Sequence, residues 1–167
     1  NQKRKDGVTS YSDHLEGVVN RLKNLGIADK DVLCAAWLHD IIEDTNVTFD
    51  QINERFGRDI AVIVLSLSKD QSIPKKDRES QYINQLKDAP SQTKIIKLCD
   101  ISANLKDLAN ASISKTQKNK QIKKYLHYLR MIKNDISEYK SRYPKIQEVI
   151  DGINAICIKF NQSPISV

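Results

Sequence analysis

The sequence predicts an all-α fold, a single-domain helical bundle that spans residues 1–167. Glycine and proline are sparse, with five and four residues, and aromatic residues make up only 6%, which suits helices better than a sheet with frequent tight turns. Apolar residues recur three and four positions apart through most of the chain, the period of an amphipathic helix. A chain of this length with 40% hydrophobic content can enclose a sizeable core. Because no repeat, low-complexity tract or linker interrupts the pattern, we expect one domain of about seven helices.

The first two helices are predicted by apolar spacing and by a stop signal. Residues 10–26 carry apolar side chains on one face, and Gly26 suits the position just past a helix end. A second helix is expected from about Asp29 to Glu43.

The later helices are predicted by caps and prolines. The sequence TFDQ at 48–51 matches a capping box and opens a short helix that stops near Gly57. Pro74 suits the first position of a helix, and Pro90 is expected to end that helix. The remaining expected helices cover 58–68, 91–108, about 115–139 and 144–160.

The basic charge of the chain is concentrated in one segment. The formal net charge is +6, and lysines cluster in SKTQKNKQIKK at 114–124. This segment has no interleaved aromatic residues and no known nucleic-acid motif, so nucleic acid is not an expected partner. We interpret it as a solvated, lysine-rich helix start, with attraction of a phosphate-bearing small molecule as the functional alternative.

Composition also predicts the compartment. No apolar run approaches the roughly 20 residues that a membrane span needs, and no signal-peptide pattern is present. The three cysteines, Cys34, Cys99 and Cys157, are widely spaced among apolar neighbours, which favours buried thiols in a reducing compartment over disulfides or a zinc site. We expect a soluble, cytoplasmic protein with no membrane contact.

A dense polar cluster ends the second predicted helix. His39, Asp40, Glu43 and Asp44 lie within six positions. Residues four apart share a helix face, so His39 aligns with Glu43, and Asp40 aligns with Asp44. Unpaired carboxylates here would be costly because the preceding side chains are expected to be buried, namely Leu33, Ala35, Ala36, Trp37 and Leu38. A metal ion would compensate, since imidazole with carboxylates is a common ligand set for divalent first-row ions.

Two distant residues could complete such a ligand set. The alternative for His39 and Asp40 alone is that they merely end a helix, with solvated carboxylates after them. However, His14 lies in the first helix, and Asp100 lies in the apolar sequence KIIKLCDISANLKDL, where a carboxylate is otherwise out of place. His127 has no acidic neighbour and is expected to be an ordinary packed or surface histidine.

The order His14, His39-Asp40, Asp100 resembles the HD superfamily of metal-dependent phosphohydrolases, which have a helical fold. Four segments, RKDGVTSYSDH, HDIIEDTNVTFDQINERFG, SKDQSIPKKDRESQYI and KIIKLCDISANLKDL, narrow the resemblance to the hydrolase domain of the RelA/SpoT homologues. These enzymes remove the 3′-pyrophosphate from (p)ppGpp. The stretch DQSIPK at 70–75, together with the absence of a synthetase domain, is similar to the stand-alone small alarmone hydrolases. The resemblance covers about residues 4–110 and extends into the helical tail.

The resemblance implies a role for individual residues. Its metal ligands, usually for manganese, match His14, His39, Asp40 and Asp100. The acidic pair implicated in water activation matches Glu43 and Asp44. The nucleotide contacts of the family match Arg4, Lys5, Tyr11 and Asn104. Without the resemblance, Arg4 and Lys5 would be interpreted as a frayed basic terminus and Tyr11 as a packing residue.

Three departures from the family pattern affect substrate detail more than catalysis. Leu15 follows His14 where the family commonly has proline, and residues 101–103 are Ile-Ser-Ala where a basic residue, leucine and an aromatic residue or histidine are usual. The loop from Arg4 to His14 also varies in length among relatives. Because the sequence begins almost at Arg4, we expect a preceding family helix to be truncated or missing.

The resemblance implies hydrolysis of (p)ppGpp to GDP or GTP and pyrophosphate with one manganese ion. Two alternatives stay open. One is a related nucleotide phosphohydrolase, such as an enzyme that removes the 2′-phosphate of NADPH. The other is a catalytically silent helical module that binds nucleotide or nucleic acid.

Overall fold

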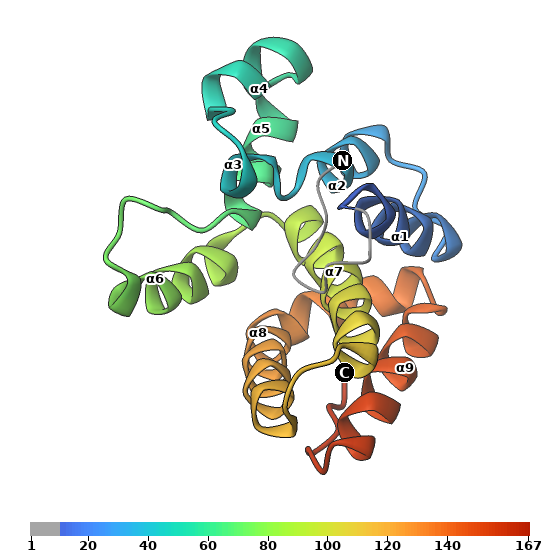
Figure 1. The fold of residues 1–167 in the computed structure, drawn as a ribbon. Helices are drawn as coiled ribbons and strands as arrows, with labels where there is room; N and C mark the ends of the chain where they lie inside the picture. Colours follow the sequence, from blue (N-terminus) through green and yellow to red (C-terminus); the bar gives the residue numbers. More distant parts are fainter. Residues whose placement is uncertain (1–10) are drawn as a thin grey trace.

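The structure is a computed structural model that describes residues 11–167, and in this part of the chain every regular element is a helix (Figure 1). The predicted all-α class is therefore confirmed. The predictions for Arg4 and Lys5 lie outside the described residues. The described helices are α1 (Tyr11–Asn24), α2 (Lys30–Leu38), α3 (Ile41–Asp44), α4 (Phe49–Phe56), α5 (Arg58–Leu67), α6 (Lys75–Asp88), α7 (Ser91–Asn110), α8 (Lys115–Arg142) and α9 (Ile146–Lys159).

Helix α7 is the centre of the bundle. It contacts α1, α2, α5, α8 and α9, and Figure 1 shows α8 and α9 on either side of its lower part, with α1 and α2 beside its upper part. Its apolar residues are fully buried on several faces, including Ile95, Ile96, Leu98 and Ile101. A helix buried on most of its circumference must also bury any polar residue it carries, and Asp100 is such a residue, with only 3% of its surface exposed.

Most helix ends follow the predicted signals. Thr48 and Gln51 form the expected capping box of α4. Gly26 has a φ of 91°, and the amide of Ile27 donates to the Leu22 carbonyl as in a Schellman end. Pro74 is the N-cap of α6, one position before the predicted first helical position. Helix α6 ends at Asp88, just before Pro90 as predicted, and Pro90 is also the N-cap of α7.

The predicted continuous helix from Asp29 to Glu43 is wrong. Helix α2 ends at Leu38, and α3 begins at Ile41. The reason is local: Nδ1 of His39 lies 2.8 Å from the carbonyl oxygen of Ala36, which an uninterrupted helix would pair with the amide of Asp40. The break separates the two faces that the spacing rule assigned to the polar cluster.

Burial around this break also differs in part from the prediction. Ala35 and Ala36 are fully buried, whereas Leu33 and Leu38 are half-buried. Trp37 is exposed over 43% of its surface, so its predicted burial is wrong. In a short helix covered on one side only, the residue after two inward alanines turns outward.

The cysteines and the lysine-rich segment are the other features that the composition singled out. All three cysteines are free thiols; Cys99 and Cys157 are buried and Cys34 is half-buried. The lysine-rich segment is a mostly exposed start of α8, capped by Ser114. Among the described helices, none has the length and apolar character needed to cross a membrane.

We predict opposite effects of alanine at two glycines. Gly152 lies inside α9, and a Cβ added there would meet no atom within 4 Å, so Gly152→Ala should stabilise the protein by about 0.5–1 kcal/mol through helix propensity. Gly57 also has open space but a φ of 91°, so Gly57→Ala should destabilise it by about 1–3 kcal/mol. Urea denaturation measures both, and equal effects of the two changes would contradict this account.

Candidate metal centre

The first contact of the site joins α1 to α7. Helix α1 places His14 inward, because its apolar face packs on α7, and His14 is only 3% exposed. Nε2 of His14 lies 3.1 Å from Oδ1 of Asp100. Residues 86 positions apart in the sequence thus share one buried polar contact, as the predicted ligand set requires.

The break between α2 and α3 supplies the second histidine. His39 is 2% exposed, and its Nδ1 is held by the carbonyl of Ala36. A carbonyl only accepts, so Nδ1 carries the hydrogen and Nε2 is directed into the site. There Nε2 lies 3.3 Å from Oδ2 of Asp40 and 3.6 Å from Oδ1 of Asp100.

These atoms fit a metal ion. One ligand atom from each of His14, His39 and Asp100 lies within 4.8 Å of the other two. Nε2 of His39 is buried and has no hydrogen-bond partner of good geometry among the described residues, and a buried polar atom of this kind calls for a ligand. Asp40 stands at the edge of the group with 30% of its side chain exposed. The two imidazoles and two carboxylates are a suitable donor set for a divalent first-row ion.

The charged groups of the site shift one another's pKa values. Burial disfavours a charge on His39, but the carboxylates of Asp40 and Asp100 outweigh this and raise the pKa of His39 to about 10. Burial likewise opposes the charge of Asp100, yet the Lys97 ammonium and the two histidines hold the pKa of Asp100 well below its usual range. The pKa of Asp40 is also lowered, against its burial, chiefly by His39. The carboxylates are therefore ionised and ready to bind a cation.

Glu43 lies on α3 beside this group. It is half-buried, and its Oε1 accepts a 2.7 Å hydrogen bond from the backbone amide of Lys69. Burial raises the pKa of Glu43, and the negative charge of Asp40 adds to the effect, while Lys69 opposes it. A carboxylate with a raised pKa and one tethered oxygen has the properties of a general base.

The remaining predicted residues lie at the surface, beside Asp100 or outside the described side chains. Asp44 is exposed at the end of α3. Nδ2 of Asn104 donates to Oδ1 of Asp100 over 2.5 Å, so Asn104 contacts a predicted metal ligand. Tyr11 begins α1, and its side chain lies outside the described part of the structure. His127 is exposed on α8, as expected.

Sequence reasoning missed a group of residues around Lys97. Nζ of Lys97 donates to Oδ2 of Asp100 over 2.8 Å, and Nζ of Lys69 pairs with Glu79 at 3.2 Å. Both ammonium groups lie over the rings of Tyr82 and Tyr128. The available signal was a lysine one turn before Asp100 in an otherwise apolar segment.

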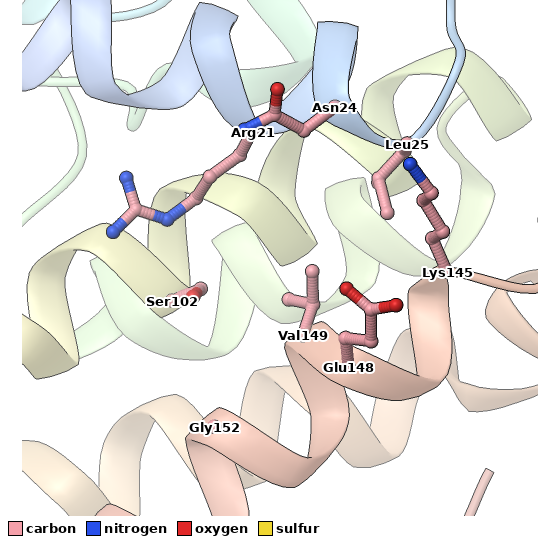
Figure 2. A pocket seen from close by; sticks show the side chains of 8 residues that line it. All are labelled: Arg21, Asn24, Leu25, Ser102, Lys145, Glu148, Val149 and Gly152. Atoms are coloured by element: carbon pink, nitrogen blue, oxygen red, sulfur yellow. The ribbon is translucent and has the colours of Figure 1, made fainter.

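A separate pocket lies between α1, α7 and α9 and has a volume of about 250 Å³ (Figure 2). Figure 2 shows the side chains of Arg21 and Lys145 on opposite sides, with Glu148 between them. None of its eight lining residues is a predicted site residue. This pocket is therefore a separate feature of the surface and not part of the predicted metal site.

The site combines a histidine of one helix, a His-Asp pair at a helix break and an aspartate of the central helix. In a helical bundle, this combination is the one expected of an HD-type domain. The model of the HD domain family matches residues 1–129. This chain belongs to that family.

Named relatives agree with this assignment. The chain is 41% identical over 110 residues to the guanosine-3′,5′-bis(diphosphate) 3′-pyrophosphohydrolase MESH1 of Danio rerio, and 38% identical over 109 residues to that of Homo sapiens. These matches cover 65% and 64% of this chain and 61% of each relative's length. The chain thus spans about three fifths of the length of these two relatives.

Solved structures share the fold. A structure described as a metazoan ortholog of SpoT that hydrolyses ppGpp superposes with a TM-score of 0.80 and 26% identity, covering 93% of this chain and 86% of the other. A Listeria monocytogenes protein superposes with a TM-score of 0.66 and 24% identity, covering 88% and 97%. The helical arrangement of the HD domain is therefore shared over nearly the whole chain.

We predict that metal affinity rises with pH. The pKa of about 10 means that His39 is protonated at neutral pH in the metal-free protein, and a metal must displace that proton from Nε2. Affinity for Mn²⁺ should therefore increase by up to about tenfold per pH unit between pH 6.5 and 8. Calorimetry in buffers of different ionisation enthalpy measures both the affinity and the proton released.

The matched control is His127→Gln, which removes an exposed histidine on α8 and should leave the pH dependence unchanged. Affinity that does not vary with pH, or a pH dependence that disappears in His127→Gln, would contradict the role given to His39.

Proposed function

We propose that this protein hydrolyses (p)ppGpp to GDP or GTP and pyrophosphate in the cytoplasm, with one manganese ion as cofactor. The observation that carries the proposal is the buried cluster of His14, His39 and Asp100, with Asp40 at its edge. The names of relatives near 40% identity supply the substrate.

In this proposal His14, His39, Asp40 and Asp100 hold the ion, with the imidazoles using their Nε2 atoms. When bound, the ion would act as a Lewis acid that polarises a phosphoryl oxygen, and it would lower the pKa of a nearby water. Asn104 and Lys97 bind the two oxygens of Asp100 and keep this carboxylate ionised and oriented.

Glu43 is assigned the role of general base. Its Oε1 is fixed by the amide of Lys69, so Oε2 is left to accept a proton from the attacking water. The water oxygen bonds to the phosphorus attached to the ribose 3′-oxygen, and the bond from that oxygen to phosphorus breaks. The 3′-oxygen takes a proton from solvent water, and Glu43 returns the proton it accepted to solvent. Asp44 is assigned to the same step as a second, solvent-facing carboxylate that orients the water.

The substrate carries several phosphoryl groups, so cationic side chains should bind it. Arg4 and Lys5 are assigned this role, with Tyr11 and Asn104 beside the nucleotide. Guanidinium and ammonium groups bind phosphate oxygens through charge-assisted hydrogen bonds. The net charge of +6 favours the approach of such a polyanion.

We predict that the Mn²⁺-loaded protein releases pyrophosphate from ppGpp and loses this activity in chelator. The experiment compares ppGpp, pppGpp, NADPH and a generic phosphate monoester side by side, with pyrophosphate and phosphate measured separately. Release of phosphate from NADPH alone would favour the related nucleotide phosphohydrolase. Turnover of the generic monoester with ppGpp untouched would reject the proposal.

We also predict that substitutions of Glu43 and Asp100 have different effects on Mn²⁺ binding and on turnover. Glu43→Gln keeps the size and the contact with Lys69 but removes the basic oxygen, so turnover should fall by about 10²–10⁴ with near-normal Mn²⁺ binding. Asp100→Ala should lose Mn²⁺ itself, because it removes a ligand. Metal content and single-turnover rates measure the two effects.

Glu148→Gln, which alters a carboxylate in the separate pocket of α9, is the control and should change neither quantity. If Glu43→Gln is purified without metal, or Asp100→Ala keeps full metal and activity, the assigned roles are wrong.

A further inference from the structure

The two oxygens of Asp100 have different surroundings. Oδ1 lies 3.1 Å from Nε2 of His14 and accepts a hydrogen bond from the side-chain amide of Asn104. Oδ2 accepts a 2.8 Å hydrogen bond from the ammonium of Lys97, which lies one turn earlier on α7. One oxygen therefore faces the histidines, and the other is bound to a cation on the opposite side of the carboxylate.

The position of Lys97 is fixed by two aromatic rings from other helices. Tyr82 of α6 and Tyr128 of α8 meet edge to face with ring centroids 5.4 Å apart, and both are essentially fully buried. Nζ of Lys97 lies 5.4 and 5.5 Å from their centroids, within the range of cation–π attraction. The hydroxyl of Tyr82 donates to the carbonyl of Leu67, which fixes that ring against the end of α5.

We propose that Lys97 is a positioning residue that holds Asp100 so that Oδ1, and not both oxygens, is presented to the metal. The Tyr82–Tyr128 pair is the support that holds the ammonium in place. This inference rests on the proposed metal centre but not on the identity of the substrate. Hydrogen-bond partners of metal ligands orient them, and their loss typically weakens metal binding by about 10–100-fold.

Direct repulsion between the Lys97 ammonium and the bound ion would have the opposite effect on metal affinity. A positive charge beside a divalent ion repels it, so if repulsion were the main effect, removal of the ammonium would tighten metal binding. The change in affinity therefore distinguishes a residue that positions Asp100 from one that only opposes the ion.

The test is Co²⁺ binding by Lys97→Met, followed by calorimetry and by the visible absorption spectrum of the bound ion. Methionine keeps an unbranched side chain and removes the charge and the donor. We expect affinity to fall by about 10–100-fold and the spectrum to change, because Asp100 becomes free to rotate and to offer both oxygens.

The matched control is Lys94→Met. Lys94 is buried one turn earlier on the same helix and pairs with Asp135 at 2.9 Å, away from the metal ligands. It should lower thermal stability yet keep native Co²⁺ affinity and spectrum. This comparison separates the loss of a buried ion pair from the loss of ligand orientation.

A second pair of variants leaves Lys97 intact. Tyr128→Leu removes a supporting ring and should weaken Co²⁺ binding, whereas Tyr128→Phe keeps the ring and should not. Native or tighter Co²⁺ binding by Lys97→Met overturns the inference; if that variant does not fold, native affinity in Tyr128→Leu overturns it. If the wild-type protein binds no metal, the proposed metal centre is wrong. If the metal-loaded protein is inactive on ppGpp, only the proposed substrate is wrong.

Discussion

The buried carboxylate of Asp100 is the constraint on which the rest of the site depends. An ionised group inside the central helix of the bundle is stable only where donors and cations surround it. Four side chains do so here: His14 from α1, His39 from the break between α2 and α3, and Lys97 and Asn104 from α7 itself. The packing of α1 and α2 on α7 therefore also brings together the side chains of the candidate metal centre.

The break at His39 and Asp40 places neighbouring residues in different surroundings. Nδ1 of His39 donates to the carbonyl of Ala36, so Nε2 is directed inward, while the side chain of Asp40 stays partly exposed. In the following short helix, Glu43 is half-buried and tethered by Lys69, and Asp44 faces solvent. A continuous helix would have fixed these residues on two regular faces, whereas after the break Glu43 is half-buried and Asp44 is exposed.

Much of this arrangement could be predicted from the sequence because its signals are local. Helical spacing and the capping box at Thr48 define elements within a few residues, and a carboxylate in an apolar segment marks Asp100 without any structure. The break was not predictable in this way, because it depends on which acceptor the ring of His39 takes. Lys97 was missed because a lysine on an amphipathic helix ordinarily extends to solvent, and only the packing of Tyr82 and Tyr128 shows that this one points inward.

The proposed metal centre holds one divalent ion between helices α1, α2–α3 and α7. Anomalous diffraction at the manganese edge, from crystals of the protein grown with Mn²⁺, tests this claim most directly. We predict one strong peak bonded to Nε2 of His14, Nε2 of His39, Oδ1 of Asp100 and a carboxylate oxygen of Asp40. A fully loaded protein whose anomalous peak lies elsewhere, or in contact with only one of these side chains, would contradict it.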